Sequence, residues 1–187
     1  MSGEIGCGGI RDDTSGRGLI HIYCGNGKGK TTCSMGLIIR ALGSGKKVLL
    51  HQFLKNNRSS ERKILNSLEN LTVIPGKEYD KFTFQMNKEE LEQVRETGDA
   101  VLSDIVSKAS DYDMVVMDEA VYAIDSGLLS EDNMIEFLQN KPESLEVVLT
   151  GRNPSDRLIG MADYVSEICK RKHPFDAGIS ARLGIEK

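Results

Sequence analysis

The chain has 187 residues, of which 39% are hydrophobic and 28% charged, and its formal net charge is -4. This length fits one domain with a buried core, and the composition excludes a chain that is disordered throughout. Since the charge balance supplies no broad basic field and no apolar run approaches the ~20 residues of a membrane span, we expect neither nucleic acid nor membrane as a partner.

The first residues, 1–16, are rich in glycine and poor in apolar side chains. Such a composition cannot offset the entropy lost on ordering, so we expect a flexible tail, followed by a single domain over residues 17–187. This stretch also lacks the apolar core of a signal peptide, which favours a cytoplasmic location.

Short β-branched or aliphatic runs then alternate with stretches of helical length. The expected strands cover residues 19–23, 47–53, 71–74, 114–117, 145–149 and 164–168. Near-continuous apolar runs are typical of strands that are buried on both faces. The pattern therefore predicts an α/β three-layer sandwich with a mostly parallel sheet and right-handed crossovers.

Three amphipathic helices are placed between these strands. The first follows the first strand and ends at Gly43 and Gly45, the longest begins at Asn87, with Glu90 completing a capping box, and the third begins at Ser130. We expect their apolar stripes to face the core. The stripe residues are Met35, Ile38, Ile39, Leu42, Leu91, Val94, Val101, Leu102, Ile105, Val106, Ala109, Met134, Ile135 and Leu138.

The strongest motif is a loop rich in glycine and lysine between the first strand and the first helix. Its glycines let successive N–H groups point at phosphate oxygens, and the helix N-terminus adds partial positive charge. Lys30 supplies a mobile charge, Thr31 a hydroxyl for Mg²⁺ and Thr32 a donor to phosphate. The expected nucleotide-binding residues are Gly25, Asn26, Gly27, Lys28, Gly29, Lys30, Thr31 and Thr32.

This loop departs from the usual GxxxxGK[ST] pattern in two ways. Cys24 stands at the first glycine position, and Lys28 adds a second lysine. Together these differences indicate that the loop binds the nucleotide in a nonstandard way.

Polar residues also follow two later strands. Asp118 and Glu119 can hold Mg²⁺ directly or through water, although an acidic pair after a strand can be a solvated turn. The guanidinium group of Arg152 can bind two phosphate oxygens at once. The alternative is that Arg152 is an ordinary surface residue. In a parallel sheet all of these side chains meet at the edge where the phosphate loop opens. Residues 170–178 fit either a solvated terminus or a substrate lid.

Four cysteines and three histidines are scattered along the chain without metal-ligand spacing. We therefore expect neither a zinc site nor a disulfide framework, and we interpret His21 and His51 as ordinary strand residues. The cysteines are Cys7, Cys24, Cys33 and Cys169.

These residues together resemble the ATP:corrinoid adenosyltransferases of the BtuR/CobO type. The resemblance runs from Arg17 to the C-terminus, and its most specific segments are the GNGKGKTT loop and the KHPFDAGI stretch that begins at Lys172. Further matching segments are RGLI at 17–20, GKKV at 45–48, QFLK at 52–55, FTF at 82–84, VMDE at 116–119, YA at 122–123, GLL at 127–129, VVLTGR at 147–152 and AD at 162–163.

The resemblance implies a P-loop NTPase fold of the RecA-like type and transfer of the 5′-deoxyadenosyl group of ATP to the cobalt of a reduced corrinoid. It further implies Mg²⁺ or Mn²⁺ held by Thr31, Asp118 and Glu119, a homodimer, and a flavoprotein as reductant. Lys30 and Arg152 would act as catalytic residues by stabilising the departing triphosphate, assisted by the second loop lysine.

The family uses an aromatic pair to crowd the lower face of the corrin, and here the matching residues are Phe82 and Phe84. Phe84 stands where tryptophan is common, Val121 where asparagine often follows the acidic pair, and Asn56 where glycine usually follows the QFxK segment. Two other functions remain open from the residues alone. A small-molecule kinase or motor-type NTPase would use Glu119 to activate a hydroxyl or water, and a nucleotide-gated binding protein would show no turnover.

Overall fold

The computed structural model describes residues 16–57, 59–78 and 85–186. Within these ranges the strands form one sheet in the order β3-β2-β4-β5-β1-β6, and each neighbouring pair is parallel. The strands are β1 (Ile20–Cys24), β2 (Val48–Gln52), β3 (Leu71–Ile74), β4 (Met114–Asp118), β5 (Glu146–Thr150) and β6 (Tyr164–Glu167). All six predicted strands are confirmed, and the expected tail at 1–16 lies almost entirely outside the described residues.

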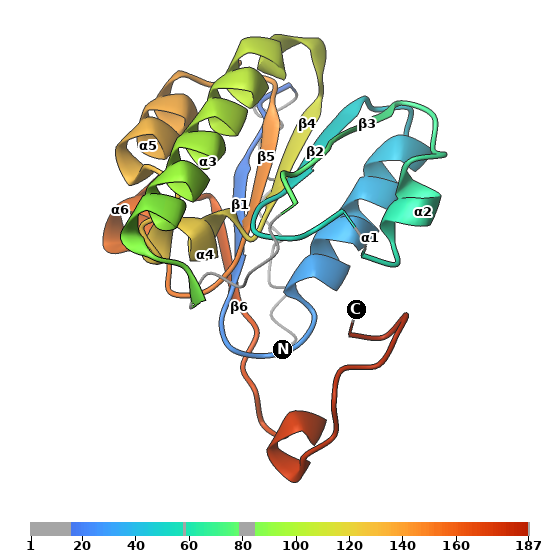
Figure 1. Cartoon of the computed structure of the whole chain (residues 1–187). Helices are drawn as coiled ribbons and strands as arrows, with labels where there is room; N and C mark the ends of the chain where they lie inside the picture. Colours follow the sequence, from blue (N-terminus) through green and yellow to red (C-terminus); the bar gives the residue numbers. More distant parts are fainter. Residues whose placement is uncertain (1–15, 58, 79–84, 187) are drawn as a thin grey trace, which may run out of the picture.

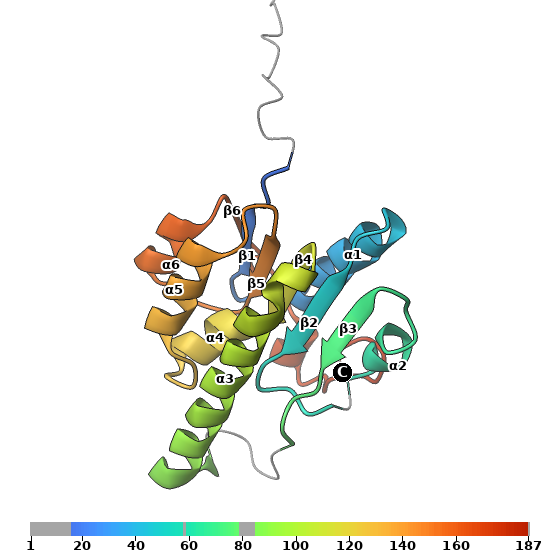
Figure 2. The ribbon, with the colours of Figure 1, turned by 90° about the horizontal axis from the view of Figure 1, so that it is seen from above.

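Helices cover both faces of this sheet. They are α1 (Lys30–Gly43), α2 (Arg62–Leu65), α3 (Lys88–Lys108), α4 (Ala120–Asp125), α5 (Glu131–Asn140) and α6 (Asp156–Met161), with 3₁₀ turns η2 (Ala109–Asp111) and η3 (Pro174–Ala177). Figures 1 and 2 show α1 and α2 on one face and α3 to α6 on the other. In the described part of the chain, no helix is long and apolar enough to cross a membrane.

Alternate side chains of the strands build a separate core on each face of the sheet. Val115 and Met117 of β4 pack toward α3, α4 and α5, whereas Met114 and Val116 pack toward α1 and α2. Successive side chains of a strand point to opposite faces, so an apolar run of this kind needs cover on both sides. The predicted three-layer arrangement is confirmed.

The predicted helix starts are also confirmed. The Asn87 side chain accepts a hydrogen bond from the Glu90 N–H, and the Glu90 carboxylate accepts one from the Asn87 N–H, which completes the capping box. Ser130 caps α5 by accepting from the Asn133 N–H.

Two predictions about burial are wrong. Ile39 and Val106 are predicted to lie in the core, but they are 52% and 45% exposed. The buried faces of their helices are narrower than the predicted stripes, with Ser34, Ile38 and Ala41 on α1 and Val94, Gly98, Leu102 and Ile105 on α3. The last strand, β6, is also exposed along its length, since it forms the edge of the sheet and pairs only with β1 within the described ranges.

Candidate active site

The phosphate loop lies at the carboxyl edge of the sheet, between β1 and α1. Gly25 and Gly29 have φ angles of 101° and 126°, which are strained for any residue with a side chain. Gly27 donates its N–H to the Ile168 carbonyl at 2.6 Å, and a Cβ at Gly27 would lie 2.6 Å from that oxygen. The glycines thus let the loop lie directly against the chain that leaves β6.

Cys24 departs from the loop pattern because the strand continues through this position. It is the last residue of β1, its side chain is buried, and it pairs with Glu167 of β6. The curled part of the loop therefore begins one residue later, at Gly25.

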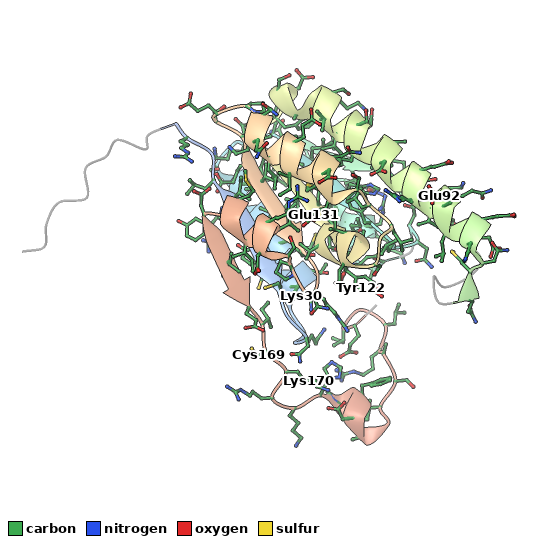
Figure 3. All side chains as sticks on the ribbon, turned by 90° about the vertical axis from the view of Figure 1, so that its left-hand side faces the viewer. Lys30, Glu92, Tyr122, Glu131, Cys169 and Lys170 are labelled. Carbon is green, nitrogen blue, oxygen red and sulfur yellow. The ribbon has the colours of Figure 1, made fainter. Side chains whose placement is uncertain are left out.

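Lys30 opens α1 and folds back over the loop. Its Nζ donates to the Gly27 carbonyl at 2.8 Å, and the residue is only 8% exposed. Burial lowers the pKa of Lys30 below its usual value; the nearby Glu119 opposes this shift and Arg152 adds to it. Figure 3 shows Lys30 at the edge of the sheet that faces the C-terminal segment, which carries Lys170.

Asp118, the last residue of β4, is the centre of a buried polar cluster. Its Oδ1 accepts from the hydroxyls of Thr150 at 2.6 Å and Thr31 at 3.0 Å. Its Oδ2 accepts from the Lys55 Nζ at 2.6 Å and from the Gln52 Nε2 at 3.2 Å. The structure thus brings the predicted Thr31 and Asp118 together and adds three side chains around them.

The two adjacent acids have different environments. Burial alone would raise the pKa of Asp118, but the charge of Lys55 and the hydrogen bonds hold it below its usual value, so this carboxylate is ionised. Glu119 has a left-handed φ of 60°, and its N–H donates to the Thr150 hydroxyl at 2.9 Å. Burial raises the pKa of Glu119, and the charge of Asp118 raises it further.

Hydroxyl and carboxylate oxygens such as those of Thr31, Asp118 and Glu119 are the ligands that Mg²⁺ prefers. In the described ranges, no cluster of three or more His, Cys, Asp or Glu side chains could hold a metal ion by itself. Mg²⁺ is commonly bound by one or two carboxylates together with substrate phosphates. The donor set therefore fits a metal ion that arrives with a nucleotide.

The other predicted nucleotide-binding residues lie around the same loop. Arg152 follows β5 and is exposed. Burial is the main cause of both pKa shifts, and the Arg152 charge adds to the lowering of the Lys30 pKa and opposes the rise of the Glu119 pKa. Thr32 is exposed on the first turn of α1. The aromatic pair Phe82 and Phe84 lies outside the described residues.

The C-terminal segment lies against the loop. Asn26 Oδ1 accepts from the Lys170 N–H at 2.8 Å, and the Lys28 Nζ donates to the Ile185 carbonyl at 2.5 Å. Most side chains of the segment between these contacts are exposed, and Phe175 is 73% accessible. The chain therefore contacts the loop at Lys170 and Ile185, and the substrate lid at residues 170–178 stays a prediction beside the solvated terminus.

Sequence reasoning did not assign Gln52, Lys55 and Thr150 to the site. A signal was present for two of them, because the QFLK segment places Gln52 and Lys55 just beyond a buried strand, at the same edge as the phosphate loop. Thr150 has a weaker signal, as a hydroxyl at the end of an apolar run.

Comparison with known proteins supports the resemblance seen in the sequence. The family model for ATP:corrinoid adenosyltransferase BtuR/CobO/CobP matches residues 16–186. The chain is 34% identical to the corrinoid adenosyltransferase of Escherichia coli and 35% identical to that of Salmonella typhimurium, CobA. Each alignment covers 91% of this chain and 86% of the relative. The corrinoid adenosyltransferase of Pseudomonas aeruginosa is 32% identical over 91% of this chain and 84% of its own.

A more distant structural likeness concerns the fold. A KaiC-like protein from Pyrococcus horikoshii superimposes with a TM-score of 0.50 over 84% of this chain and 75% of its own, at 12% sequence identity. The predicted RecA-like α/β fold is confirmed at this level.

Proposed function

The chain belongs to the ATP:corrinoid adenosyltransferase family BtuR/CobO/CobP, and on this basis we propose that it transfers the 5′-deoxyadenosyl group of ATP to the cobalt of a reduced corrinoid. The observation that carries the proposal is the family match over residues 16–186. The geometry agrees with it, because a phosphate loop and an ionised aspartate meet at one edge of the sheet.

The reaction requires no nucleophile from the protein. Reduced cobalt donates an electron pair to C5′ of ATP and forms the cobalt–carbon bond, while the C5′–O bond breaks and its electron pair leaves with triphosphate. The protein must therefore hold ATP in line with the cobalt and stabilise the negative charge that grows on the leaving group.

The loop residues from Gly25 to Thr32 would bind the triphosphate through their backbone N–H groups and the two lysines. Lys30 would be the principal counter-charge, since it is buried beside the loop backbone. Arg152 would approach from the end of β5, where its charge already influences Lys30. Mg²⁺ or Mn²⁺, held by Thr31, Asp118 and Glu119, would neutralise further charge on the phosphates.

The corrinoid would lie over the same edge, with Phe82 and Phe84 against its lower face. This part of the proposal rests on the family resemblance. Phe82→Ala should impair adenosylation when Co(II) corrinoid is reduced enzymatically but should spare chemically prereduced Co(I), because crowding is needed only before reduction. Equal losses in the two assays would contradict the role.

We further propose a homodimer and a flavoprotein reductant, again from the family. A cytoplasmic location fits the free cysteines Cys33 and Cys169, which are exposed and would be kept reduced there.

Product analysis tests the proposed function. The chain is incubated with ATP, Mg²⁺ and prereduced corrinoid, and the products are separated by chromatography. We expect triphosphate and adenosylcorrinoid in equal amounts. ADP with a phosphorylated acceptor or free phosphate would instead indicate a kinase or NTPase, and absence of turnover a nucleotide-gated binding protein.

A further inference from the structure

Lys55 lies at the centre of the proposed metal site. It follows β2 on a short loop, and its Nζ donates both to Asp118 Oδ2 at 2.6 Å and to the Thr31 Oγ1 at 3.1 Å. Thr31 in turn donates to Asp118 at 3.0 Å. The ammonium group therefore bridges a hydroxyl and a carboxylate, the two oxygens that would bind a divalent cation.

The burial of Asp118 explains why a cation is needed at this point. Its side chain is 0% exposed, so water cannot compensate its charge, whereas the Lys55 side chain is 26% exposed. A buried carboxylate without a partner is strongly unfavourable in a folded protein. Lys55 forms an ion pair with Asp118 at 2.6 Å, so Lys55 supplies this charge.

An ammonium and a divalent cation cannot share the position. Mg²⁺ binds oxygen at ~2.0–2.1 Å, closer than the distances of Lys55 to the same atoms, and the two cations repel each other. Because the Lys55 side chain is partly exposed and sits on a loop, it can leave without disturbing β2 or β4.

We propose that Lys55 is a resident counter-ion that occupies the divalent cation's place between Thr31 and Asp118 and leaves when the cation binds. It is a positioning residue, since it keeps the ligand pair assembled and ionised in the metal-free protein. Its presence also weakens the binding of a bare metal ion, so that the site fills with the metal–nucleotide complex, whose phosphates can receive the displaced ammonium. The inference rests on the proposed function only through the Thr31–Asp118 metal site.

The test uses Mn²⁺ alone, without nucleotide or corrinoid, and follows binding to the full chain by electron paramagnetic resonance. Lys55→Gln keeps a hydrogen-bond donor for Asp118 but removes the charge, so its Kd for Mn²⁺ should fall about tenfold relative to the wild type, a coupling of ordinary size between linked sites. Lys108→Gln is the matched control, because Lys108 pairs with Asp104 on the exposed surface of α3 and should leave the Kd unchanged.

Thermal unfolding gives a second readout. In EDTA the Lys55→Gln chain should melt below the wild type, and saturating Mg²⁺ should raise its melting temperature more than that of the wild type. A Kd within twofold of the wild-type value would overturn the proposal. So would a Lys55→Gln chain that stays unfolded at saturating Mg²⁺, since the metal should then replace the lost charge. Both measurements use the metal ion alone, so they remain valid even if the chain does not make adenosylcorrinoid.

Discussion

One buried carboxylate, Asp118, ties together the carboxyl ends of three strands and the start of a helix. Gln52 ends β2, Asp118 ends β4, Thr150 ends β5, and Thr31 lies in the first turn of α1. Asp118 accepts a hydrogen bond from each of the other three side chains. Lys55 adds the positive charge that keeps the carboxylate ionised. The site is thus assembled by the parallel sheet rather than by residues that are neighbours in sequence.

Replacing Lys30 tests the main counter-charge of the loop. Lys30→Ala should lower the rate of adenosyl transfer more than tenfold, about 1.4 kcal/mol, because the departing triphosphate loses a cation held in a buried position. Steady-state kinetics with prereduced corrinoid measure the effect, and circular dichroism checks the fold. Lys108→Ala, which removes an exposed lysine of α3, should leave the rate unchanged. Retention of more than a tenth of the wild-type rate by Lys30→Ala would refute the role.

Replacing Thr150 tests the polar cluster through stability. Thr150→Val removes a buried hydroxyl that donates to Asp118 and accepts from the Glu119 N–H, so two partners lose a hydrogen bond. The free energy of unfolding in urea should fall by about 1–3 kcal/mol. Thr97→Val, which removes a hydroxyl bonded to Gln93 within α3, should cost less than about 1 kcal/mol. Equal effects of the two substitutions would contradict the assignment.

The sequence predicts the loop, Asp118 and Arg152 because each follows a strand in a recognisable pattern. It does not predict how Lys55 and Gln52 converge on Asp118, because that depends on which strands are neighbours. The order β2-β4-β5 places the end of β2 beside the end of β4, although more than 60 residues separate Gln52 from Asp118. Non-local pairing of this kind leaves no periodic signal in the sequence.

Among the helices, α3 shows where propensity and packing disagree. Gly98 lies in the middle of this helix of 21 residues, and glycine there is unfavourable by about 1 kcal/mol relative to alanine. A Cβ at Gly98 would, however, meet the Leu128 carbonyl oxygen at 2.7 Å, which is too close for a real contact. The close approach of α3 to the chain after α4 therefore requires glycine.

A matched pair of substitutions separates these two effects. Gly36→Ala, in α1 where nothing lies within 4 Å of the added Cβ, should stabilise the protein by about 0.5–1 kcal/mol. Gly98→Ala should destabilise it by about 1–3 kcal/mol, as expected for overpacking. Urea unfolding of both variants provides the comparison. Stabilisation by Gly98→Ala would show that the helix can shift away from Leu128.

Long periodic elements are predictable here and short ones are not. The capped helices α3 and α5 begin where the sequence indicates, since their caps and apolar stripes agree. The helices α2, α4 and α6 have only four to six residues, fewer than two turns, so they carry no usable periodicity. Burial at the edge is equally hard to foresee, because the sequence YVSE of β6 does not indicate which place the strand takes in the sheet.

At the scale of the whole molecule, the phosphate loop lies between the sheet and the C-terminal segment of the same chain. Figure 1 shows that segment leaving β6 and turning back beneath the loop toward the start of α1. Its contacts reach three consecutive loop residues, through Ile168 to Gly27, Lys170 to Asn26 and Ile185 to Lys28. The C-terminal segment therefore lies directly against the phosphate loop.

The proposed reaction predicts how ATP lies in the loop. In a kinase the γ-phosphate must face the acceptor, whereas here C5′ must face the cobalt and the whole triphosphate departs. We therefore expect the nucleotide to bind in the reverse direction, with its terminal phosphate where kinases hold the α-phosphate and its adenosine directed outward. The first glycine of the loop, Gly25, comes one residue later than in the usual motif, and Lys28 is an additional lysine. Both differences agree with a changed mode of nucleotide binding.

A crystal structure with a nonhydrolysable ATP analogue and Mg²⁺ decides the orientation. In the expected arrangement the amides from Gly25 to Thr32 surround the terminal phosphates, and C5′ is accessible from the open edge of the sheet. Displacement at C5′ demands a line of approach opposite the departing oxygen. A γ-phosphate at the kinase position with C5′ shielded would therefore contradict both the orientation and direct attack by cobalt.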